Sequence, residues 1–98
     1  MHHGTANAVC LPHVLEFNYD SSKDRFAALA RQCGVEDLIA YTRELNEICK
    51  IKPCLRDYGI PESALEMLAA KAIEDGCHQS NPRPCTVDDL LMLYRKSW

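Results

Sequence analysis

The sequence predicts an all-α fold: a compact bundle of five to six helices forming one domain of 98 residues. Apolar residues recur at intervals of three and four along most of the chain, which is the spacing of one buried helix face. No segment alternates polar and apolar residues over a useful length, so no strand is expected. Single prolines and glycines separate the periodic segments, as is typical of helices joined by short connections.

Three helices are expected in the first half of the chain. Asn7–Phe17 has helical spacing but contains Pro12, which lacks a backbone N–H and should bend the helix. The next helix is capped by one residue of the stretch Asp20–Ser22 and ends at Gly34, which tolerates the left-handed conformation. A third helix is expected between Glu36 and Pro53. The predicted buried faces are Phe26, Leu29, Ala30 and Cys33 in the second helix, and Leu38, Tyr41, Leu45, Ile48 and Cys49 in the third.

The second half is expected to contain a helical turn, two helices and one substantial loop. Leu55–Gly59 forms the turn, and Pro61 followed by an acidic residue opens the next helix. Gly76–Cys85 holds two prolines, which keep it out of helical geometry. Thr86 and Asp89 resemble a capping box for the last helix. The predicted buried residues are Leu65, Leu68, Ala69, Ala72 and Ile73, then Val87, Leu90, Leu91 and Tyr94.

The charge and apolar content exclude several classes of partner. Eleven basic and 14 acidic side chains give a net charge of −3, with no Lys/Arg cluster, which argues against nucleic-acid binding. No unbroken apolar run is longer than five residues, far below the roughly twenty needed to span a bilayer. No secretory signal is evident near Met1, so a cytoplasmic location is expected.

The six cysteines are expected to be reduced thiols. None of them forms a CxxC pair, and the chain is not loop-rich as disulfide scaffolds are. Cys10 and Cys49 lie among apolar residues at helical spacing, where a free thiol behaves as a small hydrophobe. The positions are Cys10, Cys33, Cys49, Cys54, Cys77 and Cys85.

The four histidines do not by themselves encode a metal centre. His3 and His13 are ten residues apart, about 15 Å along a helix, so they cannot share an ion. His2 and His3 are equally compatible with a purification-tag remnant or a frayed terminus, and His13 with a helix-surface or partly buried imidazole. His78 beside Cys77 lacks an orienting carboxylate, so no catalytic pair is predicted. No glycine-rich phosphate loop follows a strand, so no nucleotide site is predicted.

Short motifs at both ends of the chain carry information beyond periodicity. They are His3-Gly4, Ala6-Asn7-Ala8, Leu11-Pro12-His13-Val14 and Phe17-Asn18 near the start, Leu55-Arg56-Asp57-Tyr58-Gly59-Ile60 in the middle, and Asp75, Cys77, Asn81-Pro82-Arg83, Thr86 and Asp88-Asp89 near the end. In this order they resemble the C-terminal part of the iron-containing, or group III, alcohol dehydrogenases. The resemblance covers essentially all 98 residues.

The resemblance implies the helical half of a two-domain enzyme whose N-terminal α/β domain binds NAD(P). In that family a divalent iron or zinc is held by one Asp and three His, and His3 matches the last of these histidines. Cys77 matches a position that lines the substrate end of the cleft in some members. The other ligands and the nucleotide-binding domain would lie before Met1.

The implied reaction is hydride exchange between an alcohol carbon and a nicotinamide ring, with the metal as Lewis acid. Because the chain offers one metal ligand of four, we expect it to hold neither metal nor NAD(P) stably by itself. No catalytic or cofactor-binding residue is assigned.

Two other functions are compatible with the sequence. One is a stand-alone helical module that binds a protein partner, and the other is a small metal-binding protein that uses His2, His3 and a cysteine between molecules. If the chain is a fragment of the longer enzyme, helices that normally pack against the missing half should expose apolar surface. We therefore expect self-association, or association with a missing N-terminal domain or chain, through a face around Val9, Leu11 and Val14.

Overall fold

The computed structural model describes residues 2–98, and in this range it contains five α-helices, four short 3₁₀ helices and no strand. The all-α prediction is confirmed. None of these helices is long and apolar enough to cross a membrane. The elements in order are α1 (His3–Asn18), η1 (Tyr19–Ser21), α2 (Lys23–Cys33), α3 (Leu38–Ile48), η2 (Leu55–Tyr58), η3 (Glu62–Ala64), α4 (Leu65–Glu74), η4 (Gly76–Ser80) and α5 (Val87–Ser97).

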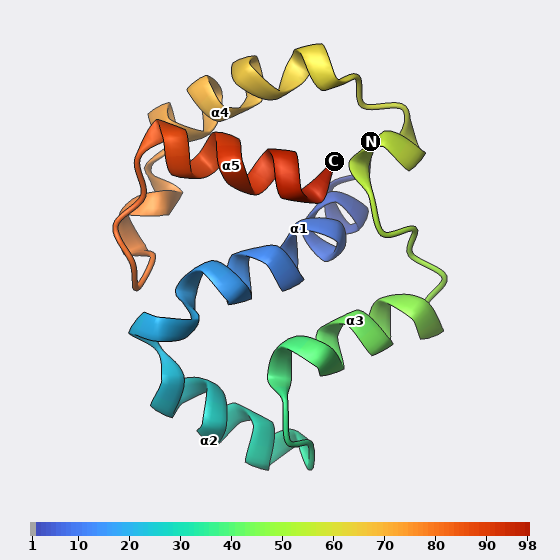
Figure 1. Cartoon of the computed structure of the whole chain (residues 1–98), viewed down its shortest axis with the longest axis vertical. Helices are drawn as coiled ribbons and strands as arrows, with labels where there is room; N and C mark the ends of the chain where they lie inside the picture. The colour runs from blue at the N-terminus through green and yellow to red at the C-terminus, as the bar shows by residue number, and fades with distance from the viewer. Residues whose placement is uncertain (1) are drawn as a thin grey trace.

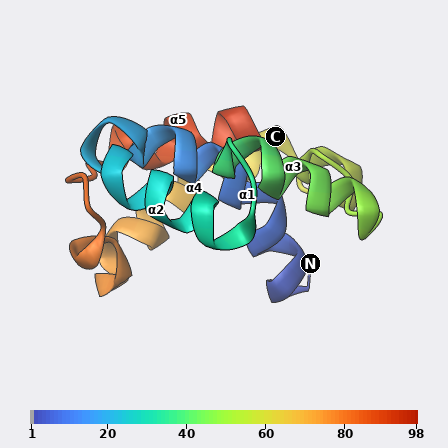
Figure 2. The ribbon, with the colours of Figure 1, turned by 90° about the horizontal axis from the view of Figure 1, so that it is seen from below.

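The helices lie in a flat layer with extents of 39 × 31 × 17 Å (Figures 1 and 2). A helix with its side chains is about 10–12 Å across, so 17 Å leaves room for little more than one layer. α1 packs against α3 on one side and α5 on the other, and α4 packs against α5. The core is consequently thin, and its buried apolar residues are Val9, Phe17, Ala30, Leu55, Leu65, Ala69 and Leu93.

α1 continues through Pro12 as a single helix, and its ribbon changes direction along its length (Figures 1 and 2). Proline removes the N–H that would donate to the carbonyl four residues earlier, which is that of Ala8. Asn46 of α3 supplies the missing donor, since its Nδ2 lies 2.7 Å from the Ala8 carbonyl oxygen. The proline that bends α1 thus also creates a docking point for α3.

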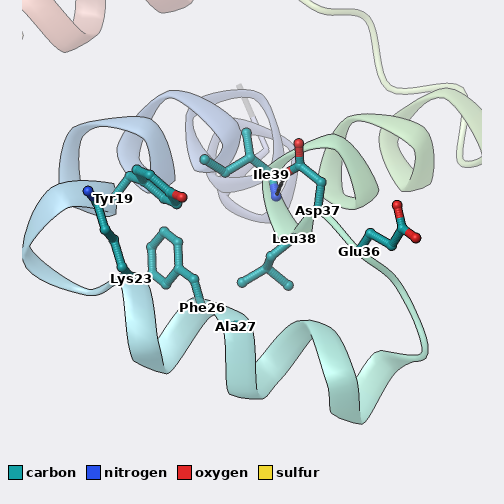
Figure 3. Close-up of a pocket in the computed structure, with 8 residues that line it drawn as sticks. All are labelled: Tyr19, Lys23, Phe26, Ala27, Glu36, Asp37, Leu38 and Ile39. Atoms are coloured by element: carbon teal, nitrogen blue, oxygen red, sulfur yellow. Dashed lines mark hydrogen bonds between the residues drawn. The ribbon is translucent and has the colours of Figure 1, made fainter.

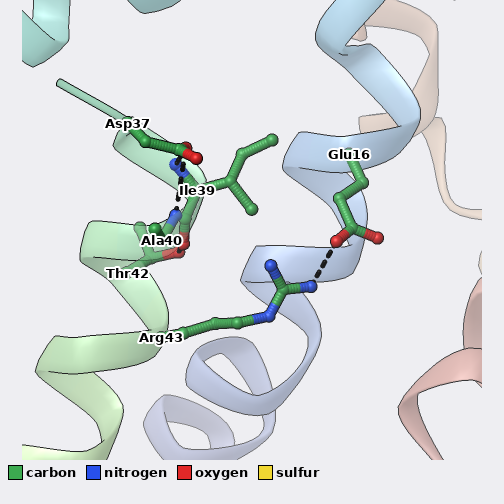
Figure 4. A network of polar contacts seen from close by, with 6 residues as sticks. All are labelled: Glu16, Asp37, Ile39, Ala40, Thr42 and Arg43. Carbon is green, nitrogen blue, oxygen red and sulfur yellow. Dashed lines mark hydrogen bonds and ion pairs between the residues drawn. The ribbon is translucent and has the colours of Figure 1, made fainter.

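α3 is anchored at its start and along one side. Asp37 caps it by accepting hydrogen bonds from the backbone N–H groups of Ile39 and Ala40, at 3.0 and 3.1 Å. Arg43 reaches across to Glu16 of α1 and donates to its carboxylate (Figure 4). These polar contacts fix the edge helix against the central one.

The predicted buried face of α3 is wrong in its second half. Leu45 is 39% exposed and Ile48 is 68% exposed, and α3 buries none of its residues. The apolar spacing is that of an amphipathic helix, but α3 lies at the edge of a single layer and has no second layer to cover it.

α2 begins and ends where the sequence indicates. Ser22 occupies the N-cap position, although its hydroxyl makes no capping bond, and Gly34 ends the helix with φ of 71°. Ala30 is buried, whereas Leu29 is 51% exposed. α2 therefore contributes little to the core.

The second half of the chain follows the prediction at its turns and caps, but Val87, predicted to be buried, is 42% exposed at the start of α5. Gly59, with φ of 82°, ends the turn η2, and Pro61 precedes η3 and α4, in which Leu65 and Ala69 are buried. The capping box of α5 is confirmed, with 3.1 Å from the Asp89 N–H to the Thr86 hydroxyl and 3.0 Å from the Thr86 N–H to the Asp89 carboxylate. The predicted loop Gly76–Cys85 begins instead with the 3₁₀ helix η4, started by the Asp75 cap.

The motifs from the two ends of the chain meet in space. Asn18 and Asn81 exchange amide hydrogen bonds of 2.8 and 2.7 Å. Arg83 donates to the carbonyl of Phe17 at 3.1 Å, and its guanidinium lies 3.9 Å from the centre of the Phe17 ring. We call these four residues the asparagine–arginine clamp. It ties the loop before α5 to the C-terminal end of α1.

Candidate functional site

His3 is the first residue of α1, and its side chain is exposed. Its Nε2 lies 3.2 Å from Nδ2 of Asn7, one turn further along the same face of the helix. Nδ1 has no hydrogen-bond partner among the residues that the structure describes. The imidazole is therefore held on one side and open on the other.

A largely apolar cavity of about 410 Å³ opens beside His3, between α1, α4 and α5. Its volume falls at the lower end of the range of about 300–1,000 Å³ typical of small-molecule sites. Sequence periodicity placed some of the lining residues, such as Leu68, Leu90 and Tyr94, on buried helix faces, and did not show that they leave a space. The lining residues are His3, Ala6, Asn7, Cys10, Val14, Leu55, Ile60, Leu68, Leu90, Leu93, Tyr94 and Ser97.

Cys10 and Ser97 form the polar part of the cavity wall. Burial raises the pKa of the Cys10 thiol, and a hydrogen bond with Ser97 partly offsets that shift. Ser97 is 1% exposed and donates to the Leu93 carbonyl at 2.8 Å. The thiol is consequently neutral near pH 7, which keeps the cavity suited to uncharged ligands.

The described residues supply one ligand for a metal ion, not a complete set. Within residues 2–98 no three His, Cys, Asp or Glu side chains are grouped so that they could hold an ion. The exposed, singly bonded ring of His3 has the chemistry of one ligand. A stable iron or zinc site normally takes three or four protein ligands, so the others must come from elsewhere.

His2 takes a structural role, because its Nδ1 accepts a hydrogen bond from the N–H of Gly4 at 3.3 Å and caps α1. The His2 ring is therefore occupied in capping the N-terminus of α1.

Cys77 lies in η4 and lines a second cavity of about 390 Å³ at the other end of α1. Val14, Leu90 and Leu93 line both cavities and separate them. The structure therefore does not bring Cys77 to the cavity beside His3. A hydrogen bond with Asp75 and the charge of that carboxylate raise the pKa of Cys77, so its thiol stays protonated near neutral pH.

One ring nitrogen of His78 is anchored to the backbone at the end of α4. Its Nε2 lies 2.9 Å from the backbone carbonyl of Ile73 and so carries the proton that it donates there. Within residues 2–98 no hydrogen bond joins the His78 ring to the Cys77 thiol.

His13 is half-buried between α1, α3 and α5. Burial lowers its pKa, the charge of Glu16 raises it, and the charges of Arg43 and Lys96 lower it further. The net direction is downward, as expected of the partly buried imidazole that the sequence indicated.

This shift predicts a pH dependence of stability. Because the unfolded chain binds a proton on His13 at about pH 6.5 and the folded chain only at lower pH, acidification below about 6.5 favours unfolding. Urea unfolding at about pH 7.5 and 5.5 should show a lower free energy of unfolding at the acidic pH, and His13→Gln should reduce that difference. An unchanged difference in the variant would refute the role of His13.

A further cavity of about 440 Å³ lies between α2 and the start of α3 (Figure 3). Tyr19 and Phe26 stack there with ring centres 6.1 Å apart, and Lys23 lies 5.6 Å from the centre of the Tyr19 ring. None of the residues singled out as a candidate site lines it.

The fold and the site define a class: a helical domain that offers one open imidazole beside an apolar cavity. Residues 1–98 match the family model described as "Fe-containing alcohol dehydrogenase family, C-terminal". The chain therefore belongs to the iron-containing alcohol dehydrogenase family, as its C-terminal part.

Individual relatives agree with this assignment. Lactaldehyde reductase of Escherichia coli K12 is 34% identical over 98% of this chain and 28% of that protein. NADPH-dependent butanol dehydrogenase of Clostridium saccharobutylicum is 34% identical over 94% of this chain and 27% of that protein. A crystal structure of 1,3-propanediol oxidoreductase aligns with a TM-score of 0.89 and 32% identity over the whole chain, which covers 28% of that structure. The chain thus spans little more than a quarter of the length of these relatives.

Proposed function

We propose that this chain forms the helical wall of an NAD(P)-dependent alcohol dehydrogenase site and contributes His3 as one ligand of a divalent iron or zinc. The family match over the whole chain carries the proposal. The exposed imidazole of His3 at the mouth of an apolar cavity supports it, because a metal ion bound to that imidazole and a small alcohol bound in the cavity would be neighbours.

In this proposal, each group of residues in the chain has one role in the site. His3 would give Nδ1 to the ion with the ring proton on Nε2, and the Asn7 amide, turned so that its Oδ1 faces Nε2, would accept from that N–H and orient the ring. The side chains of α1, α4 and α5 receive the hydrocarbon part of the alcohol and exclude water. When bound, the ion would supply Lewis-acid polarisation of the alcohol oxygen, and NAD(P) would supply the hydride acceptor.

The function can be tested by transplanting the chain. We would replace the matching C-terminal segment of 1,3-propanediol oxidoreductase with residues 1–98 and assay oxidation of 1,3-propanediol after loading with iron or zinc. The chimera should oxidise the diol, whereas the isolated 98-residue chain with the same metals and NAD(P) should show no turnover. A folded, metal-loaded chimera without activity, or turnover by the isolated chain, would contradict the proposal.

The comparisons favour the dehydrogenase over a stand-alone interaction module, and association through apolar surface is compatible with both. Val9 is 2% exposed and belongs to the core, so of the predicted face only Leu11, 44% exposed, and the half-buried Val14 remain available. We propose that the chain self-associates through the surface around Leu11.

Light scattering provides the test of self-association. The mass of the chain should rise above 11.1 kDa as its concentration increases through the micromolar range. Leu11→Glu should restore the monomer mass, and Leu29→Glu on α2, where the side chain is 51% exposed, should not. A monomer at all concentrations would argue against this surface.

We also propose a reducing, cytoplasmic location. All six cysteines are free thiols in the structure, as the sequence predicted, which suits a reducing compartment.

A further inference from the structure

The cavity beside His3 runs along one face of α1. The helix residues that line it include His3, Asn7, Cys10 and Val14, which follow one another at intervals of four, three and four residues and so form one stripe. From His3 to Val14 the helix advances about 16 Å, at about 1.5 Å per residue. The cavity is therefore elongated, and we call it the α1 groove.

α5 runs antiparallel to α1 along the groove. The asparagine–arginine clamp holds the loop before α5 at the C-terminal end of α1, and Leu90 in the second turn of α5 lines the same cavities as Val14. Near the other end of α5, Ser97 forms a hydrogen bond with the Cys10 thiol. The two helices thus face each other over most of the length of the groove.

The two ends of the groove differ in chemistry. One end has the exposed imidazole of His3, whereas Val14, Leu90 and Leu93 give the other end an aliphatic wall that separates the groove from the second cavity. None of the described residues that line the groove is Asp, Glu, Lys or Arg. This lining favours an uncharged ligand with a polar group at one end and a hydrocarbon tail at the other.

The length of the groove favours a tail of medium length. An extended chain advances about 1.2 Å per bond, because a peptide residue with its three backbone bonds spans about 3.3–3.6 Å. An eight-carbon alcohol is thus roughly 10 Å long and fills most of the groove when its hydroxyl lies near His3. A four-carbon alcohol, roughly 5 Å long, leaves the aliphatic end empty.

We propose that the α1 groove binds an unbranched primary alcohol of about eight carbons, with its hydroxyl at His3 and its terminal methyl group at Val14, Leu90 and Leu93. The inference rests on the proposed function for the ligand being an alcohol, and it adds the class of alcohol and its orientation. Burial of one further methylene group is worth up to about fourfold in affinity, so the groove should select longer chains over shorter ones.

The first test is an NMR titration of the metal-free 98-residue chain with butan-1-ol and octan-1-ol. Octan-1-ol should bind at least about tenfold more tightly and shift the signals of Ala6, Cys10 and Leu68 with a saturable curve. Equal affinities would overturn the proposal, as would octan-1-ol shifts confined to Asn46 and Ile51, which line a different cavity.

Val14 allows the length of the groove to be changed in both directions. Val14→Phe fills the aliphatic end and should bring the affinity for octan-1-ol to within about threefold of that for butan-1-ol. Val14→Ala creates space there and should raise the affinity for decan-1-ol relative to octan-1-ol. Leu29→Phe, on the exposed surface of α2, is the control and should change neither ratio. Unchanged ratios in both Val14 variants would show that the methyl group does not reach this end.

The second test uses the metal-loaded chimera with 1,3-propanediol oxidoreductase, and it separates this inference from the proposed function. The chimera should oxidise octan-1-ol with a kcat/KM at least about tenfold above that for butan-1-ol. A chimera that oxidises 1,3-propanediol but shows no such preference would overturn the inference and leave the proposed function standing. A folded chimera that oxidises none of these alcohols would overturn both.

Discussion

His3→Ala in the chimera with 1,3-propanediol oxidoreductase should remove the bound metal and lower kcat/KM by at least about 100-fold. Loss of a residue that only orients a metal ligand typically costs about 10–100-fold in affinity or activity, and loss of the ligand itself should cost no less. His3 is exposed and its one side-chain hydrogen bond within residues 2–98 is the exposed pair with Asn7, so the substitution should leave the fold intact. Metal content by elemental analysis and steady-state kinetics measure the two effects.

His2→Asn is the matched control, since asparagine is a strong N-cap and replaces the function that His2 performs for α1. This variant should keep both metal and activity. If His2→Asn and His3→Ala behaved alike, the effect would come from the start of α1 rather than from a ligand, and the assignment of His3 would fail.

Asn18→Ala should lower the free energy of unfolding by about 2–4 kcal/mol. Asn18 is 6% exposed and exchanges two amide hydrogen bonds with Asn81, so its removal breaks both and leaves Oδ1 of Asn81 without its donor, although Nδ2 of Asn81 keeps the Arg83 carbonyl. Domains of this size have only about 5–15 kcal/mol of stability, so the loss should be evident as a large drop in the urea midpoint.

Asn7→Ala removes the same side chain from an exposed position of the same helix and should change the free energy of unfolding by no more than about 0.5 kcal/mol. Equal losses in the two variants would show that the asparagine–arginine clamp contributes nothing beyond helix propensity.

The sequence predicts the helices well because the signals that begin and end a helix lie within the helix or next to it. Gly34 ends α2, Asp89 and Thr86 cap α5, and Leu65 and Ala69 of the predicted stripe are buried. These features depend on spacing and backbone preference within one or two turns, which a single sequence contains.

The failures concern packing between helices. Leu45 and Ile48 have the spacing of a buried face but are exposed, because periodicity shows which side of a helix is apolar and not whether another element covers it. The contact of Asn46 with the carbonyl freed by Pro12 joins residues far apart in the chain, so no local pattern predicts it.

In the candidate site, too, the sequence predicts local features but not those that depend on packing between helices. His3 was identified through the motif that contains it, while its contact with Asn7 and the cavity beside it became visible only in three dimensions. The i, i+4 spacing of His3 and Asn7 was a usable signal for that contact. Nothing in the sequence places Cys77 at the opposite end of α1 from His3, since that position depends on how the loop before α5 folds onto Phe17 and Asn18.

The central claim is that His3 binds the metal of an alcohol dehydrogenase site. The most direct measurement is the anomalous scattering of zinc in crystals of the loaded chimera. We predict a peak about 2.0–2.1 Å from one ring nitrogen of His3. A fully occupied zinc whose ligands do not include His3 would contradict the claim.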